Sequence, residues 1–321
     1  MERVSPRWAI LAGLPLLLFA ACTETSERPT VEPQPPTANA GEAQATASPT
    51  SIPRDVGFWS VPREELASVA QLGVTAVFHA ARTPAELREY LGAARAAGLR
   101  VLVSLVPHDL AVDPQCREER DSHGCPFDLP AFTAALEPYA GVLDAYGDIV
   151  IAHVLFDEPF DPTNWGGTAM TWETIAAAAE ASRDRFPVPV AVNVGTLRQP
   201  VPPGVLDLVL VTFYSNKERR EGPLDAYLAA QAAQLPTDGR PGLVVLLQGF
   251  GDSRSPFPTP DELRARGETA CRHDDVRAVF WWTWSKPGLV DFRSVLDEAS
   301  GEEYRDAIRD VAAACLAPVP G

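Results

Sequence analysis

The sequence predicts an α/β fold, a single (β/α)8 TIM barrel over residues 53–317, preceded by a signal peptide and a disordered tether. Three observations predict it. Apolar runs of strand length alternate with helical stretches, which is typical of a parallel sheet. The eight repeats occupy about 265 residues, close to the size of such barrels. No Gly-x-Gly-x-x-Gly fingerprint or phosphate loop follows the first strand, which disfavours an open nucleotide-binding sheet.

The strand candidates are continuous runs of Val, Ile and Leu, as expected for strands that are covered on both faces. In chain order they are Val56–Trp59, Val74–His79, Arg100–Val106, Ile149–Phe156, Val188–Val194, Leu206–Tyr214, Gly242–Gly249 and Val276–Trp284.

Helical periodicity fills most of the intervals between these strands. The clearest case is Thr83–Ala97, where Thr83 is a capping residue, Pro84 is the first helical residue and Glu86 is the acid of a capping box. The other predicted helices are Pro62–Leu72, Pro130–Tyr146, Trp172–Phe186, Pro223–Leu235, Pro260–His273 and Glu302–Cys315. The link at 195–205 is short and rich in proline, which predicts a degenerate crossover.

The N-terminal segment has the pattern of an export signal. Arg3 and Arg7 precede an apolar run, and Leu-Phe-Ala-Ala-Cys at 18–22 resembles a bacterial lipobox. That resemblance implies lipidation of Cys22; an ordinary signal peptide or a membrane helix is the alternative. Residues 23–52 contain almost no large apolar residue, which predicts a disordered tether. We therefore expect an exported protein, lipid-anchored to the bacterial cell membrane or envelope.

Charge and cysteine content narrow the classes of partner. The net charge is −16 without a basic patch, so nucleic-acid binding is not expected. Four cysteines remain after Cys22, an even number in an oxidising compartment. We predict the pairs Cys116–Cys125 and Cys271–Cys315, because no CxxC spacing favours the alternative of a metal site. No metal or cofactor is expected, and the domain is expected to be a monomer.

The stretch at 149–159, IVIAHVLFDEP, is the most informative part of the sequence. An apolar strand ends in Asp157 and Glu158, and Pro159 then stops it because proline cannot donate to the ladder. Chemistry in α/β barrels lies at the carboxyl ends of the strands. Adjacent side chains on a strand point to different sides, so the two acids should diverge. We take Glu158 as the reactive one.

The ends of the other strands carry residue types suited to sugars. Aromatic rings stack on the apolar face of a pyranose, and amides and acids bond its hydroxyls. The candidates at the strand ends are Trp59, His79, His108, Asp109, Asn193, Tyr214, Gln248, Asp252, Trp281, Trp282 and Trp284. Trp282 and Trp284 share a strand face, which favours both as site residues. His79 and His108 could instead serve structure alone.

This arrangement resembles the clan A glycoside hydrolases. That clan carries a general acid/base glutamate after an asparagine at the end of strand four, a nucleophilic glutamate at the end of strand seven, and commonly a tryptophan after strand eight. Glu158 matches the first position, and Trp282 or Trp284 matches the last. Asp157 replaces the asparagine, and Gln248, which cannot act as a nucleophile, occupies the strand-seven position.

Two hypotheses follow from the resemblance. A hydrolase of an oligo- or polysaccharide would use Glu158 as general acid/base, with its second carboxyl group from Asp157, Asp252 or Asp109. The alternative is a non-catalytic carbohydrate-binding lipoprotein on the same scaffold, which Gln248 favours. A serine hydrolase is disfavoured because the sequence has no Gly-x-Ser-x-Gly elbow.

Overall fold

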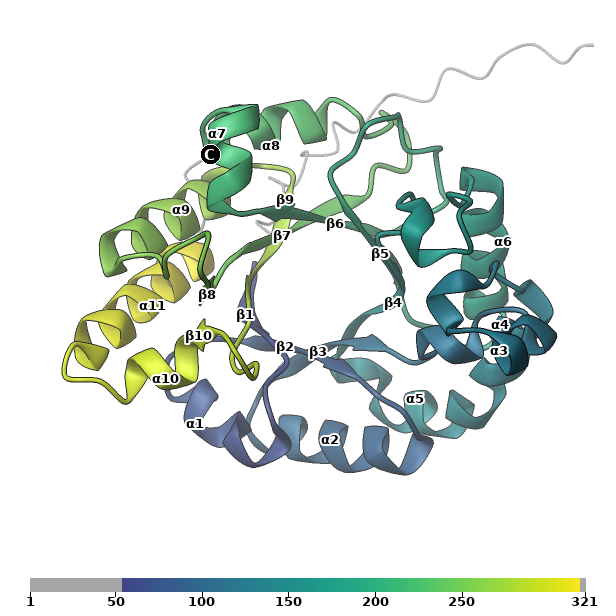
Figure 1. Cartoon of the computed structure of the whole chain (residues 1–321). Coiled ribbons are helices and arrows are strands. Elements are labelled where there is room, and N and C mark those ends of the chain that lie inside the picture. The colour runs from purple at the N-terminus through teal and green to yellow at the C-terminus, as the bar shows by residue number, and fades with distance from the viewer. Residues whose placement is uncertain (1–53, 318–321) are drawn as a thin grey trace, which may run out of the picture. The chain divides into compact units, whose positions relative to one another are not determined.

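The computed structural model describes residues 54–317, and in this range eight parallel strands close into a barrel (Figure 1). Neighbours around the barrel follow the chain order, and β9 pairs with β1 to close the ring. The barrel strands are β1 (Asp55–Trp59), β2 (Ala76–Ala80), β3 (Arg100–Ser104), β4 (Val150–Asp157), β5 (Val190–Gly195), β6 (Leu208–Phe213), β7 (Gly242–Gln248) and β9 (Val276–Trp282). The predicted fold and all eight predicted strands are confirmed.

The helices surround the strands, as Figure 1 shows in a view along the barrel axis. They are α1 (Leu66–Ala70), α2 (Pro84–Ala96), α3 (Pro114–Glu119), α4 (Leu129–Leu136), α5 (Ala140–Tyr146), α6 (Trp172–Arg183), α7 (Ser215–Glu221), α8 (Leu224–Ala232), α9 (Pro260–Arg272), α10 (Phe292–Leu296) and α11 (Gly301–Leu316). Thr83 caps α2 as predicted, because its hydroxyl accepts the N–H of Glu86 at 3.2 Å.

The structure departs from the predicted elements in two ways. The helix expected over 130–146 is interrupted by a 3₁₀ turn at Glu137–Tyr139, since Pro138 has no N–H to donate. The short helices α3, α7 and α10 and the antiparallel pair β8 (Phe250–Gly251) with β10 (Val290–Asp291) were not predicted. As expected, β5 passes to β6 without a helix in the described chain.

Apolar side chains form two layers separated by the strands. Inside the barrel lie residues such as Phe78, Leu102, Leu246 and Phe280, each at most 6% exposed. Outward-facing strand residues pack against the helices to form the larger outer layer. The interior of the barrel is therefore filled by side chains, and a ligand cannot pass through it.

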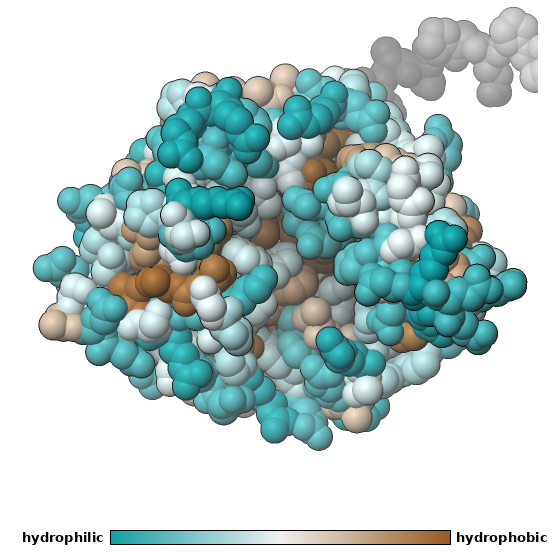
Figure 2. Space-filling view, in the orientation of Figure 1, coloured by the Kyte–Doolittle hydropathy of each residue, from teal (hydrophilic) through white to brown (hydrophobic). Residues whose placement is uncertain are grey.

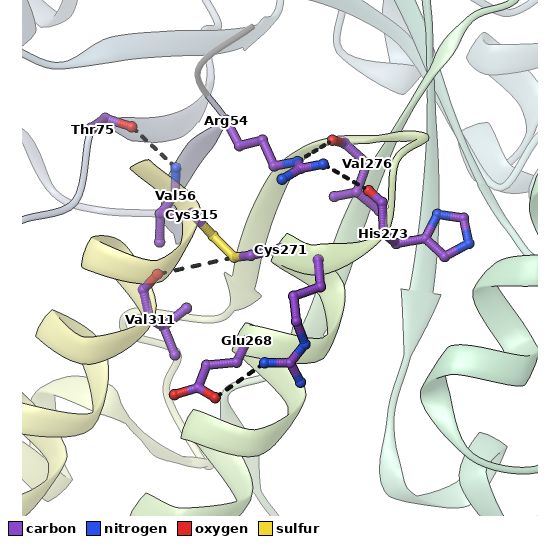
Figure 3. The surroundings of a disulfide bond; sticks show 10 residues. Arg54, Val56, Thr75, Glu268, Cys271, His273, Val276, Val311 and Cys315 are labelled. Carbon is purple, nitrogen blue, oxygen red and sulfur yellow. Dashed lines mark hydrogen bonds and ion pairs between the residues drawn. A yellow bond between two sulfur atoms is a disulfide. The ribbon is translucent and has the colours of Figure 1, made fainter. Parts of the chain in front are cut away.

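Both predicted disulfides are present. Cys116–Cys125 closes part of the segment between β3 and α4, and Cys271–Cys315 joins α9 to α11 (Figure 3). Beside the second disulfide, the Arg54 guanidinium donates to the backbone oxygens of Val276 at 2.9 Å and His273 at 3.1 Å. The start of β1 is thereby fixed to the start of β9.

The predicted signal peptide (1–22), its lipidated Cys22 and the predicted tether (23–52) lie outside the described residues. Within residues 54–317, no helix has the length and apolar character needed to cross a membrane.

Candidate functional site

The carboxyl end of β4 places its two acids in different cavities. Asp157 is the last residue of β4, and the backbone of Glu158 adopts the left-handed conformation with φ +47°. The backbone N–H of Glu158 donates to the backbone carbonyl oxygen of Asn193 at 2.7 Å. Glu158 lines a cavity of about 650 Å³, and Asp157 lines a separate one of about 270 Å³. The two side chains therefore point in different directions, as predicted.

Three segments build the larger cavity, which we call the Glu158 cavity. They are the residues after β4, the end of β5 with the residues that follow it, and α7. Its walls are Glu158, Phe160, Asp161, Ala169, Met170, Thr171, Val194, Gly195, Thr196, Arg198, Gln199 and Lys217. Gly195 has φ +66°, and a Cβ at this position would lie 2.9 Å from Glu158 Oε1. Both the backbone conformation and the close approach of the carboxyl group therefore require glycine here.

The carbonyl of Gly195 is held by a dense set of donors. Lys217 Nζ donates to Gly195 O and Thr196 Oγ1, both at 2.6 Å, and to Thr212 Oγ1 at 2.7 Å. The Tyr227 hydroxyl also donates to Gly195 O at 3.0 Å. Burial lowers the pKa of Lys217 to about 8. These contacts fix the backbone against which the Glu158 carboxyl group rests.

The surroundings of Glu158 favour its protonated form. Its carboxyl group lies in the mouth of the barrel, the face formed by the carboxyl ends of the strands and the segments that follow them. Glu158 is exposed as a whole residue, and partial desolvation of its carboxyl group is the largest cause of its raised pKa; the negative charges of Asp157 and Asp161 act in the same direction. The Lys217 ammonium opposes them with a smaller effect. A glutamic acid in this state can donate a proton at a higher pH than a free one.

Asp157 is paired with the amide of Asn193. Asn193 Nδ2 donates to Asp157 Oδ1 at 2.5 Å, while Asn193 Oδ1 accepts the Gly195 N–H at 3.1 Å. Burial raises the pKa of Asp157, and the Asn193 hydrogen bond partly offsets this. In the Asp157 cavity, His108 Nε2 lies 2.6 Å from Asn164 O, and the His108 ring stacks on His123. The carboxyl group of Asp157 is thus oriented before any ligand arrives.

Aromatic rings complete the mouth. Tyr214, Phe250 and Trp282 pack on one another with ring centres 5.0 to 6.3 Å apart. Burial and the nearby charges of Asp157 and Glu158 raise the pKa of Tyr214, so this phenol stays neutral and lies beside the acids. Trp59 stacks on Phe78 at 3.4 Å between centroids and is largely buried, so it forms the floor of the mouth. Figure 2 shows a central hollow on the face that carries α7, with apolar surface below a mostly hydrophilic rim.

Two predicted site residues lie outside the mouth. His79 is on the outward face of β2, where it stacks on Tyr90 of α2 at 3.7 Å; burial lowers its pKa to about 4. Trp284 is buried in the outer layer, and its indole N–H donates to Glu65 at 2.5 Å. The prediction that Trp284 shares a face with Trp282 is wrong because β9 ends at Trp282 and the strand alternation ends with it.

Two further predicted site residues are engaged in hydrogen bonds within the protein. Gln248 is 1% exposed; its amide nitrogen donates to the oxygens of Phe250 and Pro256, and its amide oxygen accepts the Ser215 N–H. Its side chain holds two segments of the mouth together and has no free group for a sugar. Asp252 Oδ1 accepts the N–H groups of Arg254 and Ser255, both at 2.7 Å, and Asp252 is not among the residues that line the Glu158 cavity.

Sequence reasoning missed Lys217 and Lys286, although a simple signal marks them. The chain has 27 basic residues, and all but these two are arginine. Lys217 lies in the Glu158 cavity, and Lys286 Nζ lies 4.6 Å above the centre of the Trp282 ring. Asp161, which also lines the Glu158 cavity, was missed because it follows the strand end by several residues. No cluster of three or more potential metal-ligating His, Cys, Asp or Glu side chains occurs within 54–317.

No protein-family model and no curated protein sequence matches this chain. Similar solved structures include a GH2 β-galacturonidase from Eisenbergiella tayi bound to galacturonate, with TM-score 0.57, 12% identity, and coverage of 82% of this chain and 51% of that one. An endo-β-1,4-mannanase from Thermotoga petrophila gives TM-score 0.55 and 12% identity, with coverage of 83% and 77%. A GH113 β-1,4-mannanase gives TM-score 0.55 and 13% identity, with coverage of 82% and 99%. The chain thus spans about half of the galacturonidase and nearly all of the GH113 enzyme. Its fold is the closed (β/α)8 barrel that these glycoside hydrolases share.

Proposed function

We propose that the mouth of the barrel binds an oligo- or polysaccharide and that Glu158 is the general acid that cleaves a glycosidic bond. One observation carries the proposal: the Glu158 carboxyl group lies at the end of β4 in a cavity of about 650 Å³ and has a raised pKa. A cavity of this size accommodates a small ligand. The charges of Asp157 and Glu158 act on Tyr214, and the rings of Tyr214 and Trp282, with centres 6.3 Å apart, suit the apolar face of a sugar.

In the proposed mechanism, Glu158 gives its proton to the oxygen of the leaving sugar. Asp157 opens into the separate cavity and acts through its charge, which helps to raise the pKa of Glu158. Asp161 lines the same cavity as Glu158, and hydrogen bonds from Thr163 lower its pKa, which keeps it ionised. We assign Asp161 as the base that activates water. Direct attack by water inverts the anomeric centre and needs no nucleophile on β7.

A second candidate function is carbohydrate binding without turnover. It is favoured by Gln248, whose side chain occupies the strand-seven end and is committed to three backbone groups. On this alternative the same mouth binds the saccharide and Glu158 serves as a hydrogen-bond donor to a hydroxyl group.

The test is a screen of the full chain against aryl glycosides and polysaccharides, together with the variant Glu158→Gln. The exposed Glu180→Gln on α6 is the matched control. Turnover that is lost in Glu158→Gln and kept in Glu180→Gln supports the hydrolase. A saccharide-dependent rise in melting temperature without turnover supports binding alone. Turnover that is unchanged in Glu158→Gln contradicts the assignment of this residue.

We also propose that the protein is exported and held at the cell envelope by a lipid on Cys22. The two disulfides support an oxidising compartment, because such bonds are rare in the cytosol. In the native host, Cys22→Ser should move the protein out of the membrane fraction. Retention of the variant in that fraction would contradict the lipid anchor.

A further inference from the structure

The cations of the mouth are distributed unevenly. The segments that follow β5, β6, β7 and β9 carry six basic side chains without an ion pair to an acid among residues 54–317: Arg198, Lys217, Arg219, Arg220, Arg254 and Lys286. The acids of the mouth are instead concentrated in the segments after β3 and β4. Glu218, Glu221 and Asp252 lie in the same segments, so this half of the mouth carries both signs of charge, with the cations in excess.

Lys286 covers the ring on which a sugar would stack. Its ammonium lies 4.6 Å above the Trp282 centroid, and the side chain is otherwise exposed. A neutral sugar that stacks on this face must displace the ammonium and lose the cation–π contact. A sugar with an anionic substituent also moves the Lys286 ammonium off the ring, but its anionic group can then form an ion pair with that ammonium. The arrangement therefore favours an anionic ligand over a neutral one.

Arg198 is a second cation of the mouth, and it lies in the Glu158 cavity, whereas Lys286 lies against Trp282. It lines that cavity from the segment after β5 and is exposed. Lys217 lines the same cavity, but its three protons are already donated to Gly195, Thr196 and Thr212. Lys217 therefore contributes charge to the cavity, whereas Arg198 can also form a bidentate contact with an anion.

We infer that the saccharide bound at this mouth carries anionic groups, and that Arg198 and Lys286 recognise them. The inference rests on the proposed function, because it takes saccharide binding at the mouth as given and names the class of saccharide. The recognised chemistry is an oxyanion on a sugar ring. A uronate carboxylate and a sulfate ester are its two sources.

The experiment measures by calorimetry how tightly the full chain binds three oligosaccharides of equal length: a polyuronate fragment, a sulfated glycan fragment and a neutral glycan. The variants are Arg198→Gln and Lys286→Gln. Arg88→Gln is the matched control, because Arg88 is an exposed arginine on α2 that forms no ion pair with any residue of 54–317. We expect each mouth variant to weaken binding of the anionic fragment by roughly three- to tenfold, and the control to leave it unchanged.

The outcomes separate this inference from the proposed function. Tighter binding of one anionic fragment than of the neutral one, lost in the mouth variants and weakened by salt, supports the inference and identifies the anion. Equal binding of neutral and anionic fragments overturns it while saccharide binding stands. Equal weakening in Arg88→Gln overturns it as well, since general charge attraction then explains the affinity. Failure to bind any of the three fragments overturns both.

Discussion

The variant Gln248→Glu tests whether a carboxyl group can occupy the end of β7, the position at which the clan A glycoside hydrolases that the sequence resembles carry a nucleophile. The wild-type amide nitrogen donates to Phe250 O at 2.9 Å and to Pro256 O at 3.0 Å. An ionised carboxyl group donates nothing and would face both carbonyl oxygens. We therefore expect a less stable protein with no gain of activity.

The magnitude follows from the lost hydrogen bonds. Each carbonyl left without its partner costs roughly 1–3 kcal/mol, so two cost roughly 2–6 kcal/mol. A protonated carboxyl group can donate one hydrogen bond, which recovers part of that loss. The site is buried, so the introduced carboxyl group has a raised pKa in the folded state, and its destabilising effect grows as the pH rises through that value.

The assay is urea unfolding at pH 5 and pH 8, with Gln231→Glu as the control. Gln231 is also buried at 4% exposure, but its amide oxygen accepts the Leu197 N–H at 2.6 Å, which a carboxylate can do equally well. We expect the control to lose less stability than Gln248→Glu. Equal losses in the two variants, or a Gln248→Glu protein as stable as wild type, would refute the structural role assigned to Gln248. New turnover would refute the expectation about activity.

Three further predictions address the site and the fold. In Gly195→Ala, the positive φ and the 2.9 Å approach to Glu158 Oε1 should lower stability by about 1 kcal/mol and kcat/KM by about tenfold or more; unchanged kinetics would contradict the positioning of Glu158. Burial lowers the pKa of His153 to about 3, so its contribution to stability is complete above the unfolded pKa of ~6.5 and falls with pH by about 1.4 kcal/mol per unit toward 3. Urea unfolding should show a shallower acid slope in His153→Phe than in wild type, and identical slopes would contradict this. Removing the Cys116–Cys125 disulfide by a double serine variant should cost roughly 2–3 kcal/mol in denaturant unfolding, and no loss would mean that the loop is held by other contacts.

The sequence was sufficient for the barrel because its evidence is local and repeated. Each strand is a continuous apolar run, and the end of β4 is marked by Pro159 directly after two acids. The disulfide pairs followed from cysteine number and spacing. The prediction of Glu158 as the candidate acid needed only the rule that chemistry lies at carboxyl ends of strands, and the cavity at this residue agrees with it.

The rest depended on contacts between residues far apart in the chain. Gln248 is polar and stands at a strand end, but its role is decided by Ser215 and Pro256, which no local pattern connects to it. His79 needed the facing direction of its strand, and Trp284 needed the residue at which its strand ends. Side-chain direction at a strand terminus is set by such details, so a list of strand ends predicts more site residues than the mouth holds.

The first described residues enter the barrel at the end opposite to its mouth. Arg54 leads into β1 at the amino ends of the strands and is bonded there to Val276 and His273. Glu158 lies past the carboxyl end of β4, and parallel strands place all their carboxyl ends on one face. Arg54 therefore lies at the face opposite to the mouth. Substitutions at that face should affect the stability of the barrel, whereas substitutions at the mouth should affect its ligands.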